Sequence, residues 1–125
     1  MWRAYNPNPR GRFVGDCTIR AIAAATGKSW HDVYTGVSLD GYLLADMMSA
    51  NHVWGAYLHR NGWRRNLIAD NAPDDYTVAD FAADHPRGTY ILALDGHVVT
   101  VIDGDWYDTW DTGAEIPVYY WTKER

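Results

Sequence analysis

Two Asp-Gly dipeptides, at 95–96 and 103–104, constrain the fold more than any other feature of the sequence. They lie between three runs of strand-forming residues, TYILAL, HVVTVI and DWYDTW. Asp-Gly between such runs is the strongest short signal for a tight β-hairpin turn. The sequence therefore predicts three consecutive antiparallel strands over 89–94, 97–102 and 105–110. The segment IPVYYWT at 116–122 is expected to add a further strand.

The preceding part of the chain has helical patterns. The run CTIRAIAAATG predicts a helix from Cys17, with Ile19, Ile22 and Ala23 on one face and Gly27 as its stop. After it, Ser29 is a suitable N-cap for a short helix to about residue 34. Further helices are expected within LDGYLLADMMSAN, HVWGAYLHRNG and TVADFAADHPRG, with a short strand at WRRNLI. The Asn-Pro pairs of YNPNPRGRF predict an extended or turning arm.

Helices followed by a meander indicate an α+β fold, in which N-terminal helices pack on a C-terminal antiparallel sheet. The 125 residues fit one domain, residues 1–125. Apolar residues make up 47% of the chain, which is typical of a globular protein and not of a disordered one.

Composition also restricts the partners. The net charge is −5, and the densest basic clusters, RGR and RR, are too short for a phosphate-binding stripe, so nucleic acid is not expected as a partner. The apolar runs are too short to span a bilayer, and the first residues do not resemble a secretory signal. A single cysteine fits a reducing compartment. A cytoplasmic location without membrane contact is therefore expected.

The two hairpin turns set the register of the meander. Leu94 is expected opposite His97, and Ile102 opposite Asp105. Val99 then lies opposite Asp108, so His97 and Asp108 share a face with Val99 and are diagonal neighbours. Asp111 falls on the other face. A carboxylate on one ring nitrogen fixes a histidine tautomer, which leaves the other nitrogen free to take a proton from a thiol.

The one cysteine, Cys17, stands where a Gly-Asp pair leads into the first predicted helix. A lone cysteine is most often a small buried apolar residue. A helix N-terminus, however, favours the thiolate and lowers the thiol pKa. The neighbouring Asp16 is expected to cap the helix or to turn away from the sulfur. Arg20, one turn later, is expected to be a structural pairing partner and not a cation of the cleft.

The predicted helix that begins at Cys17 and the predicted strands that carry His97 and Asp108 together resemble the papain-like cysteine peptidase superfamily. GDCTIRAIA matches its cysteine helix, GHVVTVIDG its histidine strand, and YDTW its Asn-Ser-Trp segment, with Asp108 in the place of the asparagine. DCTIRAIA is also similar to the cysteine helix of ovarian-tumour-type deubiquitinases, whose pattern is Asp-x-x-Cys-x-x-Arg-Ala. Bacteriocin leader peptidases and transglutaminase-like enzymes share the Cys-His-Asp order. The matching motifs cover about half of the chain. The resemblance implies a papain-like fold and a triad of Cys17, His97 and Asp108.

The chain departs from the papain pattern in one respect, because it contains no glutamine to help hold the oxyanion. The backbone N–H of Cys17 can supply one donor, and Asn6 or Asn8 is a candidate for the second. Simple turn formation is the alternative role for both asparagines. The resemblance implies that Trp110 shields the His–Asp pair.

No metal or other cofactor is expected, because the remaining histidines lack metal-ligand spacing and DGDWYD lacks the full ligand series of a calcium loop. The resulting hypothesis is a thiol hydrolase that cleaves a peptide, isopeptide or amide bond through an acyl-enzyme on Cys17. Its partner is a peptide or protein substrate. The alternative is a papain-fold binding module, weak or inactive as an enzyme and encoded by a phage or mobile element, that acts on a host protein.

Overall fold

The computed structural model describes residues 1–68 and 72–123. Within these residues the chain forms four helices and six strands, so the predicted α+β class is confirmed. In chain order the elements are β1 (Trp2–Ala4), α1 (Cys17–Thr26), α2 (Trp30–Leu44), α3 (Asn51–Arg60), β2 (Trp63–Leu67), α4 (Val78–Asp84), β3 (Thr89–Leu94), β4 (His97–Ile102), β5 (Asp105–Asp108) and β6 (Tyr119–Lys123).

All six strands belong to one sheet with the order β1-β5-β4-β3-β6-β2. The hairpins have the predicted register, with Leu94 opposite His97 and Ile102 opposite Asp105. Asp103 and Gly104 both have positive φ, which is the requirement of a two-residue turn matching the twist of the strands. The predicted third and last strands are shortened to β5 and β6. The N-terminal arm contributes β1, which pairs in parallel with β5.

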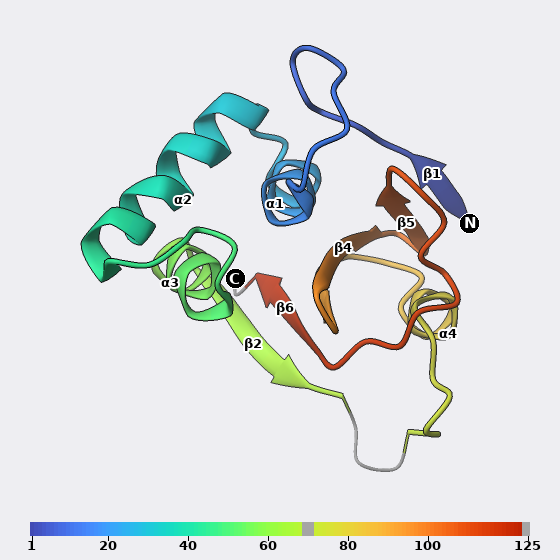
Figure 1. Cartoon of the computed structure of the whole chain (residues 1–125). Helices are drawn as coiled ribbons and strands as arrows, with labels where there is room; N and C mark the ends of the chain where they lie inside the picture. Colours follow the sequence, from blue (N-terminus) through green and yellow to red (C-terminus); the bar gives the residue numbers. More distant parts are fainter. Residues whose placement is uncertain (69–71, 124–125) are drawn as a thin grey trace.

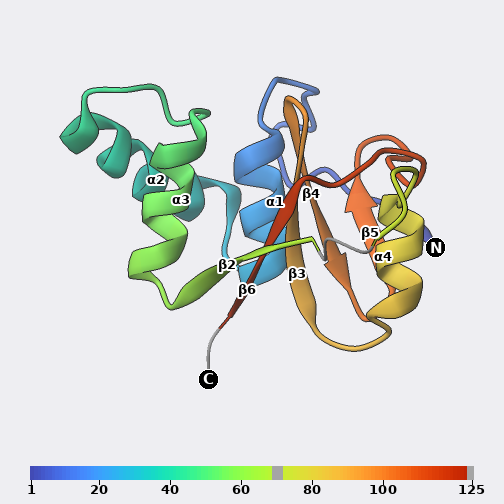
Figure 2. The same cartoon turned by 90° about the horizontal axis from the view of Figure 1, so that it is seen from below.

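Helices cover both faces of the sheet. Figure 1 shows α1 between α2 and the sheet, and Figure 2 shows α4 on the face opposite to α1. One core cluster joins α1, α2 and α3 to inward residues of β3, β4 and β6. A second cluster joins α4 to the alternate residues of β3 and β4. Thr100 marks the first face, because its buried hydroxyl donates to the Ala21 carbonyl of α1 over 2.6 Å.

The helix prediction is wrong at one place, since the helix expected to end at about residue 34 and the one expected within residues 39–51 form the single helix α2, which ends at Leu44. Ser29 caps it as predicted by accepting a bond from the Asp32 N–H. The helix continues through Gly36, whose missing side chain admits the ring of Tyr57 from α3: a Cβ there would lie 2.6 Å from Tyr57 Cε2. Close helix packing at Gly36 therefore outweighs its low helix propensity.

Two other predicted helix boundaries are confirmed. Gly27 ends α1 in a left-handed conformation, and Thr77 forms a capping box with Asp80 at the start of α4. Within residues 1–68 and 72–123, no helix combines the length and apolarity needed to cross a membrane.

Candidate active site

Cys17 is the first residue of α1, at the end of the helix that leaves backbone N–H groups without intrahelical acceptors. Its side chain is half-buried and packs beside the larger core cluster. The N-cap residue is Asp16, but its side chain makes no capping bond. His97 and the backbone of Val98 lie close enough to the sulfur to favour its ionised form.

His97 is the first residue of β4 and follows directly after the Asp95–Gly96 turn. Gly96 has a φ of +72°, a conformation in which glycine costs least. The Nε2 atom of His97 lies 2.6 Å from Oδ2 of Asp108, the last residue of β5. Since Nε2 faces the carboxylate, Nδ1 is the ring nitrogen left to serve Cys17. The structure thus brings Cys17, His97 and Asp108 together from α1, β4 and β5.

One part of the register prediction is wrong, although the predicted contact is present. Strict alternation placed His97 and Asp108 on the face of Val99. Val99 packs in the α4 cluster, whereas His97 and Asp108 contact side chains of α1. His97 and Asp108 occupy strand ends, where the ladder no longer confines a side chain to one face.

Asp108 is held from several directions. Its side chain is fully buried, and the N–H of Thr109 donates to Oδ1 over 2.7 Å. Its carbonyl accepts bonds from the indole Nε1 of Trp2, at 3.1 Å, and from the N–H of Tyr5, at 2.9 Å. The β1 arm therefore fixes the backbone of the residue that orients His97, a role the sequence did not reveal.

The ionisation of the three groups is coupled. Burial opposes ionisation of the Cys17 thiol, but the hydrogen bond and charge of His97 outweigh it and hold the pKa of Cys17 below its ordinary value. Burial also disfavours the imidazolium of His97, yet the hydrogen bonds to Asp108 and Cys17 raise its pKa to about 9. Burial likewise acts against the Asp108 carboxylate, and the bond from His97 still keeps its pKa low. These directions favour a thiolate–imidazolium pair beside a carboxylate.

Arg20 is buried and pairs with two carboxylates, as expected of a structural partner. Its guanidinium lies 2.5 Å from Oδ1 of Asp16 and 2.9 Å from Oδ1 of Asp108. The second oxygen of Asp16 accepts from the indole Nε1 of Trp30 at 2.9 Å. Asp16 therefore turns toward Arg20 and Trp30, the second of the two orientations expected for it.

Asn6 and Asn8 make turn bonds within the arm. The Asn6 amide nitrogen donates to the carbonyl of Arg12, and its oxygen accepts from the N–H of Asn8. The Asn8 oxygen accepts from the N–H groups of Arg10 and Arg12. The turn role foreseen for both residues is thus present, and a role at the oxyanion would require these bonds to break.

Trp110 and Asp111 occupy different surroundings. The Trp110 ring lies 5.3 Å from the His97 ring, centroid to centroid, and is half-exposed, so it covers one side of the imidazole. Asp111 accepts from the indole of Trp106 and from the N–H of Gly113. Of the two aspartates, Asp108 is the one bonded to His97.

A mostly apolar cavity of about 220 Å³ adjoins the start of α1. It is lined by residues that precede and follow Cys17 in the chain, together with side chains of α2 and of the loop after it, and not by Cys17 or His97 themselves. The lining residues are Val14, Gly15, Asp16, Thr18, Ile19, Trp30, Tyr34, Met48 and Ser49. Both oxygens of Asp16 are already engaged by Arg20 and Trp30. The cavity therefore suits an uncharged apolar group.

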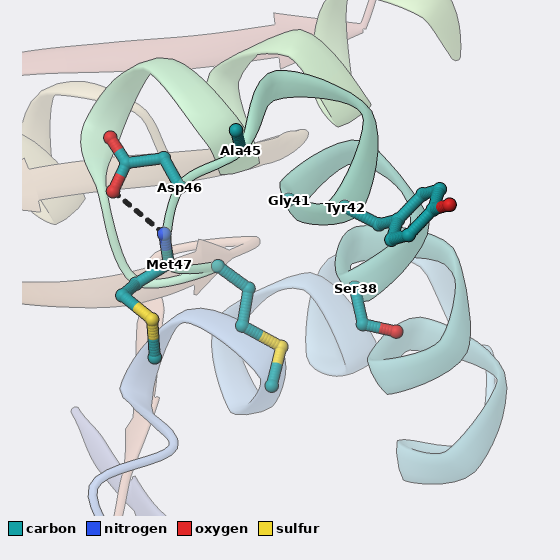
Figure 3. Close-up of a pocket in the computed structure, with 7 residues that line it drawn as sticks. Ser38, Gly41, Tyr42, Ala45, Asp46 and Met47 are labelled. Carbon is teal, nitrogen blue, oxygen red and sulfur yellow. Dashed lines mark hydrogen bonds between the residues drawn. The ribbon is translucent and has the colours of Figure 1, made fainter.

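A second hollow, of about 470 Å³, lies at the C-terminal end of α2 and shares Met48 with the first. Figure 3 shows Tyr42 and Met47 on opposite sides of it, with the carboxylate of Asp46 bonded to the Met47 N–H. Tyr42 is 81% exposed, Leu43 68% and Met47 73%. The hollow at the end of α2 thus has exposed apolar side chains and adjoins the first cavity at Met48.

Among residues 1–68 and 72–123, no three His, Cys, Asp or Glu side chains form a group that could hold a metal ion. Comparisons of the chain with protein-family models, curated proteins and solved structures found no significant match.

Proposed function

We propose that the protein is a thiol hydrolase that cleaves a peptide, isopeptide or amide bond through an acyl-enzyme on Cys17. The observation that carries the proposal is the chain of contacts from Cys17 to His97 to Asp108, in which the thiol pKa is lowered and that of the imidazole raised to about 9. Such a constellation is recognised by geometry and roles, independently of the fold that carries it.

In this mechanism the Cys17 thiolate attacks the carbonyl carbon, and the carbonyl π electrons move to oxygen. The backbone N–H of Cys17, at the start of α1, is the proposed donor to this developing charge. The tetrahedral intermediate collapses as the C–N bond breaks, and the His97 imidazolium gives its proton to the leaving nitrogen. Neutral His97 then takes a proton from water, whose oxygen attacks the thioester and releases the acid and the thiolate. Asp108 keeps the imidazole in one orientation throughout.

The substrate group that carries the carbonyl is proposed to place an apolar side chain in the cavity beside Cys17. The lining supplies Ile19, Trp30 and Met48, and it offers no uncompensated charge from Asp16. The proposed substrate is therefore a peptide or protein with an apolar residue next to the scissile bond.

The test is the rate of Cys17 alkylation by iodoacetamide as a function of pH, together with trapping of the acyl-enzyme by mass spectrometry on a panel of peptide amides. We expect fast labelling near neutral pH that collapses in His97→Ala but not in His59→Ala, an exposed histidine of α3. Labelling that follows an ordinary thiol and ignores His97 would contradict the proposal.

The second candidate function is a binding module that acts on a protein without cleaving it. The exposed apolar side chains of Tyr42 and Met47, which line the hollow at the end of α2, favour it, because exposed apolar patches are typical of protein-binding sites. The alkylation profile separates the two functions, since a binding module has no use for an activated thiol.

A further inference from the structure

Arg20 carries a buried charge whose cost the fold must offset. The residue is 5% exposed, and both of its carboxylate partners are buried as well. Removing such charges from water costs several kcal/mol per ion by order of magnitude, and well-packed apolar residues often stabilise a core equally well. Stability alone is therefore a weak reason for three buried charges at this place.

We propose that Arg20 is a positioning residue of the site, which aligns the orienting carboxylate with His97 and fixes the start of α1 against the end of β5. The inference rests on the proposed function and adds to it a residue outside the Cys-His-Asp group. Three contacts carry it: Arg20 to Asp108, Arg20 to Asp16, and Asp16 to Trp30.

The first contact sets which oxygen of Asp108 faces the imidazole. Arg20 Nη2 and the Thr109 N–H both donate to Oδ1, at 2.9 Å and 2.7 Å. Oδ1 is thereby occupied, and Oδ2 is directed at His97 Nε2 over 2.6 Å. Without the guanidinium, one donor would remain on Oδ1, and the carboxylate would be freer to rotate.

The second and third contacts act on the nucleophile. Asp16 immediately precedes Cys17. Its carboxylate accepts a hydrogen bond from Arg20 Nη1 on one oxygen and from Trp30 Nε1 on the other. Its carbonyl also accepts from the Arg20 N–H at 2.8 Å. One guanidinium therefore links the start of α1 to the end of β5. This link fixes the position of the Cys17 sulfur relative to the His97 imidazole.

The charge of Arg20 matters as well. Asp16 is next to Cys17 in the chain, and an uncompensated carboxylate there would disfavour the thiolate. The groups that face one another here are Asp16, Cys17 and Arg20 of α1, Trp30 of α2, His97 of β4 and Asp108 of β5. A lysine would restore the charge, but its single ammonium lacks the planar fork that spans two carboxylates.

The test combines Arg20→Lys with the double variant Asp16→Asn/Arg20→Gln, and uses Arg60→Lys as the matched control. Arg60 forms a comparable pair with Asp40 between α3 and α2, away from the site. Two quantities are measured in each protein: the pH midpoint of Cys17 alkylation by iodoacetamide, and the proton NMR signal of His97 Nε2–H.

For Arg20→Lys we expect a broadened or upfield-shifted Nε2–H signal and a midpoint higher by about one pH unit, which is about tenfold slower labelling on the acidic side. The double variant removes one negative and one positive charge, so it separates charge balance from positioning. We expect it to stay impaired. Recovery of both wild-type values in the double variant would reduce Arg20 to a counter-charge of Asp16 and overturn the inference, as would an unchanged Arg20→Lys.

A measurement on the wild type covers the case in which the variants do not fold. A guanidinium held by two carboxylates rotates slowly, so Arg20 should show separate Nη proton signals, in contrast to the half-exposed Arg60. A single averaged set of Arg20 Nη signals would contradict the proposal that Asp16 and Asp108 hold the guanidinium in place. Failure of the proposed function appears differently, as ordinary thiol labelling in the wild type while the Arg20 and His97 signals persist.

Discussion

The Nε2 atom of His97 and the Oδ2 atom of Asp108 lie 2.6 Å apart, between a strand that begins at one residue and a strand that ends at the other. Asp108 is fully buried, whereas His97 is partly exposed to solvent and lies beside the half-exposed ring of Trp110. The pair is thus fixed on its carboxylate side and open on its imidazole side, where a thiol and a substrate must approach.

Replacement of Asp108 by Asn should lower the pKa of His97, because the hydrogen bond and charge of the carboxylate help to hold it at about 9. The thiolate of Cys17 then loses its charged partner, and alkylation at neutral pH should fall about tenfold for each unit by which the thiol pKa rises. The measurement is the alkylation rate against pH. Asp111→Asn is the control, since Asp111 bonds to Trp106 and Gly113 instead.

Replacement of Cys17 by Ala should make stability depend on pH. His97 has a folded pKa raised from 6.5 to about 9, so its contribution is full below pH 6.5 and is lost as pH rises toward the folded value. In the wild type the lowered pKa of Cys17 gives the opposite dependence, since thiolate stabilisation grows with pH. The free energy of unfolding of Cys17→Ala should therefore fall with rising pH in this window. The His97 pKa is raised less in this variant than in the wild type, because the part of the shift caused by Cys17 is lost.

Urea denaturation at about pH 6, 7.5 and 9 measures this effect. The double variant Cys17→Ala/His97→Ala should show little dependence on pH over the same range. A single variant as flat as the double one would show that His97 is not protonated above its ordinary pKa in the fold.

Replacement of Gly15 by Leu should fill the cavity beside Cys17. Gly15 lines it, and a Cβ at this position would meet no atom within 4 Å, so the backbone accepts a side chain. Labelling by the small reagent iodoacetamide should stay within about twofold of wild type, whereas kcat/KM for peptides with a large apolar residue should drop by about tenfold or more. Gly15→Ala serves as the matched control. Equal losses for peptides with small and large residues would contradict this use of the cavity.

Replacement of Gly36 by Ala should destabilise the protein although alanine has the higher helix propensity. The propensity gain is about 1 kcal/mol. The added Cβ would lie 2.6 Å from the buried ring of Tyr57, and overpacking of this kind costs about 1–3 kcal/mol. We expect a net loss of about 1 kcal/mol in thermal or urea unfolding. Leu39→Ala, on the exposed side of the same helix, should change stability by less than about 0.5 kcal/mol.

Local signals predicted most of the secondary structure. Asp-Gly turns fixed the register of β3, β4 and β5, and Gly27, Ser29 and Thr77 marked helix ends through capping chemistry that acts over a few residues. The same register predicted the contact of His97 with Asp108, but on the face of Val99, whereas the two side chains lie on the face of α1. The break expected within α2 was wrong, because the reason for Gly36 is a ring from another helix.

The surroundings of the site were less accessible to sequence reasoning. Nothing local indicates that β1 pairs in parallel with β5, or that Trp2 and Tyr5 hold the Asp108 carbonyl. Arg20 was expected to have a structural pairing partner, but the sequence did not identify either Asp16 or Asp108 as that partner, and the pair with Asp108 depends on how the helix lies on the sheet. Such long-range placements are set by packing and leave no short-range pattern.

The position of the nucleophile in the chain has a consequence for biosynthesis. Cys17 emerges from the ribosome well before His97 and Asp108, and the forces that ionise its thiol come largely from His97. Until β4 and β5 have been synthesised and have docked on α1, the cysteine is an ordinary thiol, mostly protonated at neutral pH. The nascent chain is thereby protected from its own reactivity, and the thiol becomes reactive only as the fold is completed.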